Sequence, residues 1–267
     1  MISDLPSKVL RRSIISMIEV EKRGHIGPAM SLVEMLRVLY DSFLRYRADD
    51  PLWLNRDRLI LSKGHGCLAL YAILAEKGFF PKEELQTFCM PTSRLGGHPE
   101  WKKIPGVEAS TGALGHGLSI GVGMALSAKI RKQEYRVVVI TGDGELNEGS
   151  VWEAAMSAAK HNLSNLTVLV DNNKLQSYGL TKEVLSLEPL ADKWKAFGFE
   201  VVEVDGHDMK ALENLVARLP LSAQKPTAVI CHTIKGKGIP FAEGNADWHH
   251  KSGLKPHDIS ALYECLL

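Results

Sequence analysis

Residues 135–149 read YRVVVITGDGELNEG, a run of β-branched residues that ends in a glycine-rich, acidic turn. A strand of this composition has no polar face and is buried on both sides of a sheet. Beyond the turn, Trp152, Ala155 and Ala159 follow one another at helical spacing. The stretch therefore predicts a strand, a turn at its carboxyl end and a helix, which is the repeating unit of a parallel α/β sheet.

The same pattern recurs on both sides of this unit. Short apolar runs alternate with helical stretches, so we expect an α/β fold with a doubly wound, mostly parallel sheet and helices on both faces. The other strands are predicted over 58–61, 166–171, 199–204 and 227–231. The helices outside the central unit are predicted over 5–22, 31–43, 66–77, 82–89 and 208–218.

Local signals mark the ends of several helices. Ser3 or Asp4 is predicted to cap the first helix, and Ser31 with Glu34 predicts a capping box for the second. Asp208 is placed to cap the last of these helices. The apolar face of the first helix is expected to comprise Leu5, Val9, Ile14, Ile15 and Ile18.

The length of 267 residues fits one large domain, 1–267. We expect N-terminal helices in 1–57 to pack on an α/β core at 58–232, with a loop and tail at 233–267. Residues 235–255 are rich in glycine, histidine and lysine and predict the loop. A loop of this length is uncommon in a compact domain unless it surrounds a ligand.

The composition disfavours nucleic acid and membranes as partners. The 32 Lys and Arg residues almost balance the 31 Asp and Glu residues, so no net charge attracts phosphate backbones or anionic lipid. The sequence contains neither a basic leader with an apolar core nor a run of about 18 apolar residues. Four widely spaced cysteines without a CxxC pair are typical of reduced cytosolic thiols. Together these features predict a soluble cytoplasmic protein.

Five of the ten histidines directly follow a glycine. Glycine allows a tight turn and a close approach to a ligand, and histidine titrates near neutral pH, so the pairing suits a polar pocket built from loops. These histidines are His25, His65, His98, His116 and His207. For His207, between a strand and a helix, a structural role is favoured, and the role of His116 stays open.

Asp143, in the turn after the central strand, indicates a metal ion. Ligands bind at the carboxyl ends of parallel strands, and a helix N-terminus attracts an anion such as phosphate. A carboxylate that faces phosphate needs a cation between them, and Mg²⁺ takes oxygen ligands. Asn172 and Asn173 end the next strand, where an amide oxygen can complete the set. A plain tight turn is the alternative for the glycine-rich motif taken alone.

The order of the motifs resembles the transketolase family of thiamine diphosphate enzymes. Gly142-Asp143-Gly144, followed one strand–helix–strand unit later by Asn172-Asn173, is similar to the family's thiamine diphosphate motif. The resemblance covers almost the whole chain, with small departures from the family's pattern at Ile26 and His116. Six further segments match in order: GHIG at 24–27, SKGHG at 62–66, GHPE at 97–100, STGALGHG at 110–117, KGKG at 235–238 and WH at 248–249.

The resemblance implies a ligand set and a group of catalytic histidines. Asp143, the Asn173 side chain and the Leu175 carbonyl are expected to bind Mg²⁺, for which Ca²⁺ or Mn²⁺ can substitute. The implied cofactor-binding positions are Lys63, His65, Gly112, Leu114, Gly142, Asp143, Gly144, Glu148, Asn173, Lys235 and His249. The implied catalytic positions are His25, His65, His98 and His249. By the same resemblance, His25 and His98 face the hydroxyl groups of a donor sugar and relay protons.

The resemblance also implies a second chain. The sequence stops near the end of the diphosphate-binding domain of a transketolase and does not contain the pyrimidine-binding domain. We therefore expect a separate C-terminal subunit that carries this domain, in a two-fold α2β2 assembly. The implied reaction moves a two-carbon ketol unit from a ketose, usually phosphorylated, to an aldose.

Parts of the pattern also fit other functions. Half of a related thiamine diphosphate enzyme, similar to 1-deoxyxylulose-5-phosphate synthase or dihydroxyacetone synthase, is an alternative, as is a non-catalytic regulatory protein. A nicotinamide-binding loop at 115–121 is disfavoured because no predicted strand precedes it and the glycine spacing differs. A zinc site at His249, His250 and His257 lacks a fourth ligand at suitable spacing.

Overall fold

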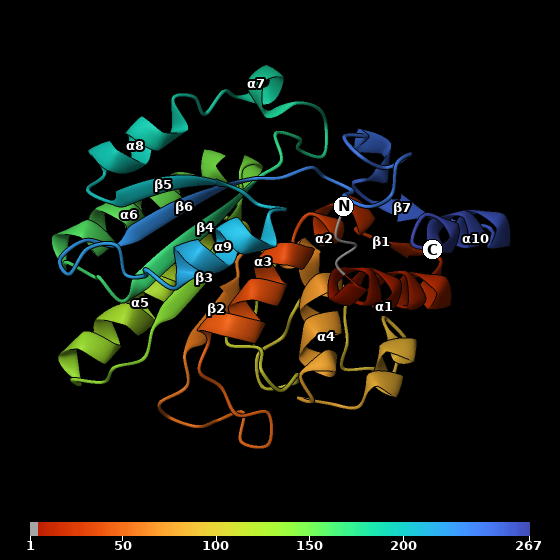
Figure 1. Ribbon diagram of the computed structural model, residues 1–267, viewed down its shortest axis with the longest axis horizontal. Helices are drawn as coiled ribbons and strands as arrows, with labels where there is room; N and C mark the ends of the chain where they lie inside the picture. Colours follow the sequence, from red (N-terminus) through yellow and green to blue (C-terminus); the bar gives the residue numbers. More distant parts are fainter. Residues whose placement is uncertain (1–4) are drawn as a thin grey trace.

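A five-stranded parallel sheet forms the centre of the computed structural model, which describes residues 5–267 (Figure 1). The strands lie in the order β2-β3-β4-β6-β5, and every neighbouring pair is parallel. They are β2 (Arg58–Leu61), β3 (Val137–Gly142), β4 (Leu166–Asn172), β5 (Glu200–Asp205) and β6 (Thr227–His232). The predicted α/β class and the five predicted strands are therefore confirmed.

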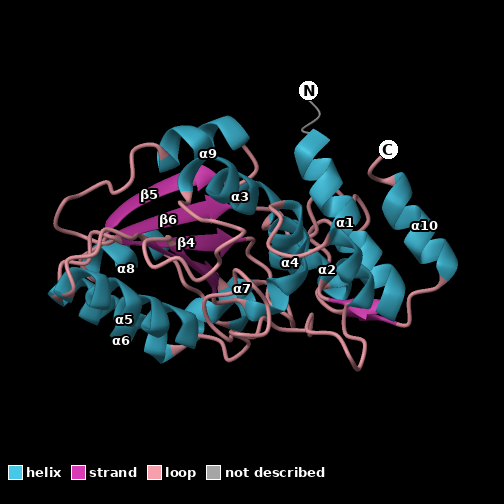
Figure 2. Ribbon diagram, turned by 90° about the horizontal axis from the view of Figure 1, so that it is seen from below, coloured by secondary structure: helices cyan, strands magenta, loops and turns pink. Residues whose placement is uncertain are grey.

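Neighbouring residues of the central strands belong to different apolar cores. Val139 and Val168 belong to the core on one face of the sheet, whereas Ile140 and Leu169 belong to the core on the other. This arrangement explains why the strands read as continuous apolar runs. Figure 2 shows helices on both faces. The first face is covered by α5 (His116–Ile130), α6 (Gly149–Lys160) and α8 (Leu190–Ala196), and the second by α3 (Val33–Val38) and α9 (Met209–Val216).

Further helices pack beside the sheet and extend the second core (Figure 1). They are α1 (Leu5–Glu21), α2 (Ile26–Met30), α4 (Cys67–Glu76) and α10 (Pro256–Glu264). In α1 the buried stripe runs through Leu10, Ile14 and Ile18. The prediction that Leu5 and Val9 belong to this stripe is wrong, because at 3.6 residues per turn they lie on the opposite side and are 65% and 43% exposed. The predicted caps Ser3 and Asp4 lie outside the described residues.

The helix predicted over 31–43 begins at Val33 and changes from α-helical to π-helical winding. It consists of α3 and a π-helical turn over Leu39–Phe43. The predicted capping box is wrong, because both of its side chains bind distant partners instead. Ser31 Oγ donates to Asp171, and Glu34 binds Arg11 and His207.

Two short strands, absent from the sequence prediction, join distant parts of the chain. β1 (Arg23–Gly24) pairs antiparallel with β7 (Lys251–Ser252), which lies inside the stretch predicted as loop. The stretch also contains a single 3₁₀ turn at Ala246–Trp248. The pairing holds the loop after α1 against the loop that carries His249.

The remaining elements are short. The helix predicted over 82–89 is a 3₁₀ helix at Lys82–Thr87, and 3₁₀ turns also occur at Gly64–Gly66 and Gly144–Asn147. α7 spans Thr181–Val184. The predicted cap of α9 is confirmed, because the Asp208 side chain accepts a hydrogen bond from the Ala211 amide. Within residues 5–267, none of the helices has the length and apolar character needed to cross a membrane.

Candidate active site

The order of the strands places four polar loops side by side. β2, β3, β4 and β6 are neighbours in the sheet, and each is followed at its carboxyl end by a polar side chain. These side chains are Lys63, Asp143, Asn173 and Lys235, and all of them line one cleft of about 260 Å³. Ligands bind at this edge of parallel sheets, so the cleft is the candidate site.

Almost all of the residues singled out in the sequence line this cleft. They are His25, Lys63, His65, His98, Gly112, Leu114, Gly142, Asp143, Gly144, Asn173, Leu175, Lys235 and His249. Glu148 differs, since its side chain is exposed at the start of α6 and it is not among the cleft residues that the structure describes. The structure adds Glu145, Gln176 and Ser177, for which the sequence predicted no role.

Asp143 is a deeply buried acid directly on the cleft, with 3% of its surface exposed. Its Oδ1 accepts a hydrogen bond from the Gly144 amide at 2.7 Å, and its Oδ2 accepts one from the Lys174 amide. Burial, together with the nearby negative charge of Asp171, raises the pKa of Asp143 to about 6. This carboxylate therefore lies where a cation would stabilise its charged form.

Asp171 lies beneath the cleft and holds four side chains. Its carboxylate binds the Lys63 ammonium, accepts hydrogen bonds from Ser31 Oγ at 2.6 Å and from Thr233 Oγ1, and accepts one from Asn173 Nδ2 at 3.2 Å. Burial by itself would raise the pKa of Asp171, but the charge and hydrogen bond of Lys63, together with the hydrogen bonds of Ser31 and Thr233, outweigh it and lower the pKa. The sequence predicted no role for Asp171, because nothing local indicates these partners.

The two buried lysines differ in the groups that surround their charges. Lys63 is paired with Asp171 and also donates to the Pro28 carbonyl at 3.2 Å. Lys235 donates to the Leu175 carbonyl, and burial followed by the charge of Lys63 lowers the pKa of Lys235 to about 8. Lys235 therefore supplies positive charge to the cleft, while most of the charge of Lys63 is balanced from below.

Glu145 is a structural acid within the turn after β3. One carboxylate oxygen accepts hydrogen bonds from Ser62 Oγ and from the Gly115 amide at 2.9 Å, and the other accepts one from the Gly142 amide at 3.0 Å. The side chain thereby joins the end of β2, the start of α5 and the glycine-rich turn. In the sequence, Glu145 could have been found from its place in the glycine-rich motif, two residues after Asp143.

Four histidine rings come together in the lining of the cleft. The centroid of the His25 ring lies 5.4 Å from that of His65, 6.2 Å from that of His98 and 5.6 Å from that of His249. Burial is the main cause that lowers the pKa of His25 to about 4 and that of His249 to about 3. Burial also lowers the pKa values of His65 and His98. At neutral pH these rings are uncharged and each can both donate and accept a hydrogen bond.

Close approaches around the histidines depend on glycine. Gly112 has φ +136°, and a Cβ at this position would lie 3.0 Å from the His98 ring. A Cβ at Gly27 would lie 2.9 Å from the Trp248 carbonyl oxygen, so the start of α2 can pack against the loop of His249. Glycine at these positions therefore lets the loops meet around the cleft.

Two buried polar atoms in the cleft have no hydrogen-bond partner among residues 5–267. They are His249 Nδ1 and Gln176 Nε2. Because buried polar atoms are usually satisfied, these two atoms indicate a polar ligand. Gln176 also packs so closely on the glycine-rich turn that a Cβ at Gly144 would lie 2.7 Å from its side chain.

Two of the glycine-linked histidines lie outside the lining of this cleft, as far as the described residues show. His116 is exposed at the start of α5, and its Nδ1 lies 3.0 Å from the Leu114 carbonyl oxygen. His207 contacts Glu34 and the Ile234 amide behind the cleft.

Comparison with known proteins assigns this fold and cleft to a family. The model of the transketolase thiamine diphosphate binding domain matches residues 5–266. The chain belongs to the transketolase family.

Relatives of similar length occur within the family. An apulose-4-phosphate transketolase subunit of Phocaeicola vulgatus is 43% identical over 92% of this chain and 88% of that protein. The 6-deoxy-6-sulfo-D-fructose transketolase subunit of a Clostridium species is 41% identical over 91% of this chain and 89% of its own length. The structure of Pichia stipitis transketolase with sedoheptulose-7-phosphate superimposes with a TM-score of 0.91 at 31% identity, over 97% of this chain and 40% of the other.

The residues of this transketolase cleft fit a diphosphate cofactor with a metal ion. Asp143, the Asn173 amide and the Leu175 carbonyl provide a carboxylate and two neutral oxygen atoms, which are the donors that hard divalent cations prefer. The Leu175 carbonyl already accepts a hydrogen bond from a cationic group, the Lys235 ammonium. The free polar atoms of His249 and Gln176 add capacity for a polar ligand.

Proposed function

We propose that this chain is the thiamine diphosphate-binding subunit of a two-chain transketolase, a transferase that moves a two-carbon ketol unit from a ketose to an aldose. The observation that carries the proposal is the cleft in which Asp143, Asn173 and Leu175 face the same space as four histidines. The similarity to proteins named as transketolase subunits, over nearly their whole length, supports the two-chain form.

In this proposal Asp143, Asn173 Oδ1 and the Leu175 carbonyl hold Mg²⁺, and Ca²⁺ or Mn²⁺ can replace it. Gly142, Gly144 and Lys235 face the diphosphate, because glycine allows a close approach of the backbone and an ammonium group stabilises phosphate charge. Further contacts to the cofactor come from Lys63, His65, Gly112, Leu114 and His249. Thiamine diphosphate, when bound, supplies the nucleophilic carbon that carries the two-carbon unit.

The catalytic work of this chain is assigned to His25, His65, His98 and His249. Their lowered pKa values keep the rings neutral, so one nitrogen can donate to a sugar hydroxyl while the other accepts. His25 and His98 contact the hydroxyl groups of the donor sugar and take protons from these groups or return protons to them. The exposed Glu148 is assigned a contact across the subunit interface.

The partner is proposed to be a C-terminal subunit that carries a pyrimidine-binding domain, in an α2β2 assembly. The relatives of similar length are themselves named as subunits of transketolases, which supports a second chain. We propose that residues 1–267 act as one domain, because one apolar core joins α1 to α10 and to the sheet. The four cysteines, all free of disulfides in the described residues, support a cytoplasmic location.

The substrates are proposed to be sugars and sugar phosphates. The relatives are named for apulose 4-phosphate and for 6-deoxy-6-sulfo-D-fructose, so both belong in a substrate panel with common ketose phosphates. These names alone do not favour one donor over another for this chain.

The test is to recover the chain with its stoichiometric partner from its native cells and to assay ketol transfer. We expect activity that needs both chains, thiamine diphosphate and Mg²⁺. Recovery of a partner with no pyrimidine-binding domain, or a complex that binds the cofactor without transferring ketol units to any acceptor, would contradict the proposal.

A further inference from the structure

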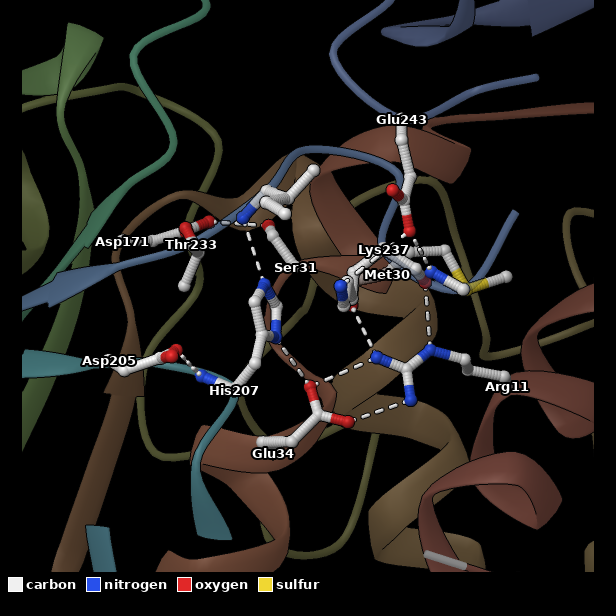
Figure 3. A network of polar contacts seen from close by, with 12 residues as sticks. Arg11, Met30, Ser31, Glu34, Asp171, Asp205, His207, Thr233, Lys237 and Glu243 are labelled. Atoms are coloured by element: carbon white, nitrogen blue, oxygen red, sulfur yellow. Dashed lines mark hydrogen bonds and ion pairs between the residues drawn. The ribbon is translucent and has the colours of Figure 1, made fainter. Parts of the chain in front are cut away.

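Glu34 is a buried carboxylate behind the cleft that binds two side chains from distant segments (Figure 3). Arg11 of α1 donates to its two oxygens at 2.7 Å and 3.0 Å, and His207 Nδ1 lies 2.8 Å from Oε2. Burial opposes the charge of Glu34, but the hydrogen bonds from His207 and Arg11 and the Arg11 charge lower its pKa to about 2. Glu34 is therefore an ionised acceptor that fixes both partners.

Both partners of Glu34 reach the same segment of the chain. His207 Nε2 accepts a hydrogen bond from the Ile234 amide at 2.8 Å, and Arg11 Nε donates to the Lys237 carbonyl at 2.8 Å. Ile234 and Lys237 lie on either side of Lys235, the buried cation of the cleft. The segment that carries Lys235 is thus held at its two ends.

The contacts of His207 define its protonation and orientation. A backbone amide can only donate, so Nε2 must carry the lone pair and the ring proton must be on Nδ1, directed at Glu34. The donor Nδ1 therefore faces an acceptor, and the acceptor Nε2 faces a donor. A ring turned over by 180° would lose both contacts.

The approach of Arg11 depends on the backbone of the segment. Gly238 has φ +91°, and a Cβ at this position would lie 2.8 Å from Arg11 Nε. The guanidinium can reach the Lys237 carbonyl because position 238 is glycine. The glycine-rich stretch after Lys235 therefore allows both the contact between Arg11 and Lys237 and the turn of the backbone.

We propose that His207, held by Glu34, is a positioning residue that fixes the segment Ile234–Lys237 and thereby keeps the Lys235 ammonium in the cofactor cleft. The inference rests on the proposed function to the extent that Lys235 faces the cofactor. His207 itself acts through the backbone of the segment. Removal of its ring frees the Ile234 amide and lets the segment move.

Hydrogen exchange of this segment tests the first step without any cofactor. Three variants are compared with wild type: His207→Ala, His207→Gln and the control His232→Ala. His232 Nε2 lies 2.7 Å from Glu203 Oε2 on the surface, so it is a second histidine–glutamate pair, at the end of β6, the strand that leads into the segment. We expect exchange in the peptide containing Ile234 to become about tenfold faster in His207→Ala, the equivalent of one net hydrogen bond.

The other two variants make the result specific. In His207→Gln the side-chain carbonyl can accept from the Ile234 amide while the side-chain NH₂ donates to Glu34, so we expect exchange close to wild type. His232→Ala should leave the segment unchanged. Unaltered exchange in His207→Ala, or the same increase in His232→Ala, would overturn the positioning role.

A double-mutant cycle with Lys235→Met tests the second step. In the complex of this chain with its partner, His207→Ala should weaken thiamine diphosphate binding about tenfold when Lys235 is present. In the Lys235→Met background it should have almost no further effect, because coupled residues are not additive. Equal losses in both backgrounds would show that His207 acts only on the fold and would contradict the inference. Absence of thiamine diphosphate binding by the wild-type complex contradicts the proposed function instead, and the exchange experiment still decides the positioning role.

Discussion

Asp171 Oδ2 accepts a hydrogen bond from Asn173 Nδ2 at 3.2 Å. The other end of this amide, Asn173 Oδ1, accepts from the Leu175 amide at 3.1 Å, so both ends of the side chain are fixed. Asp171 also binds Lys63, which follows β2, and Thr233, which follows β6. One carboxylate with 0% exposure thus joins the ends of three strands of the sheet, β2, β4 and β6.

Removing the charge of Asp171 should destabilise the protein. In Asp171→Asn the buried Lys63 ammonium loses its counter-charge, and breaking a buried ion pair on one side costs about 3–5 kcal/mol. Urea unfolding of the purified chain measures the change. The double variant Asp171→Asn with Lys63→Met should recover part of the loss, since no unpaired charge then stays buried. A single variant as stable as wild type would show that the pair contributes nothing.

Glu34 should make the stability depend on acid pH. Its pKa is about 2 in the folded chain, against 4.5 as the usual value, so the unfolded chain binds the proton more readily. The stabilisation is fully present above pH 4.5 and is lost as the pH falls towards 2, by about 3 kcal/mol in total. Unfolding free energies of wild type and Glu34→Gln between pH 7 and pH 3 measure it. The two curves should converge at low pH, and parallel curves would contradict the assignment.

Asp143→Ala should abolish Mg²⁺-dependent binding of thiamine diphosphate while the fold stays intact. The affinity should fall more than roughly 100-fold, because even residues that only orient metal ligands cost about 10- to 100-fold. Calorimetric titration of the two-chain complex measures affinity, and circular dichroism checks the fold. Asp192→Ala, at an exposed position on α8, is the matched control. Unchanged affinity in Asp143→Ala would remove Asp143 from the metal site.

His98→Ala should lower turnover with little effect on cofactor binding. A side chain that moves or holds a proton in the reaction contributes about 100-fold or more. Steady-state assays of ketol transfer give kcat, and titration gives the cofactor affinity. His116→Ala removes a histidine of the same Gly-His pattern outside the cleft and should change neither. Equal losses of turnover and affinity in His98→Ala would make His98 a cofactor contact.

The sequence predicted the sheet and the loops at its carboxyl end because both depend on local patterns. Continuous β-branched runs define buried strands, and in a parallel sheet their ends meet at one edge. The proximity of Asp143 and Asn173 was therefore expected from these patterns, whereas the place of Lys235 was implied by the resemblance to the transketolase family. The gathering of the histidines was expected from the glycine that precedes each of three of them.

The polar contacts beneath the cleft could not be predicted in this way. Ser31 and Glu34 have the spacing of a capping box, which is a local signal, but both bind residues far along the chain. The choice between the local and the distant partner depends on tertiary packing. The same holds for His207, whose two contacts come from residues 34 and 234.

The pairing of β1 with β7 has a consequence for the order of folding. Arg23 pairs with Ser252, so the side of the cleft that carries His25 forms only after nearly the whole length described here has been synthesised. Contacts between residues so distant in the sequence form late, because a large loop must close first. Pulse-labelled exchange should find residues 23–24 among the last to be protected. We therefore expect the parallel sheet to assemble before the side of the cleft that carries His25, so that the cleft is completed late in folding.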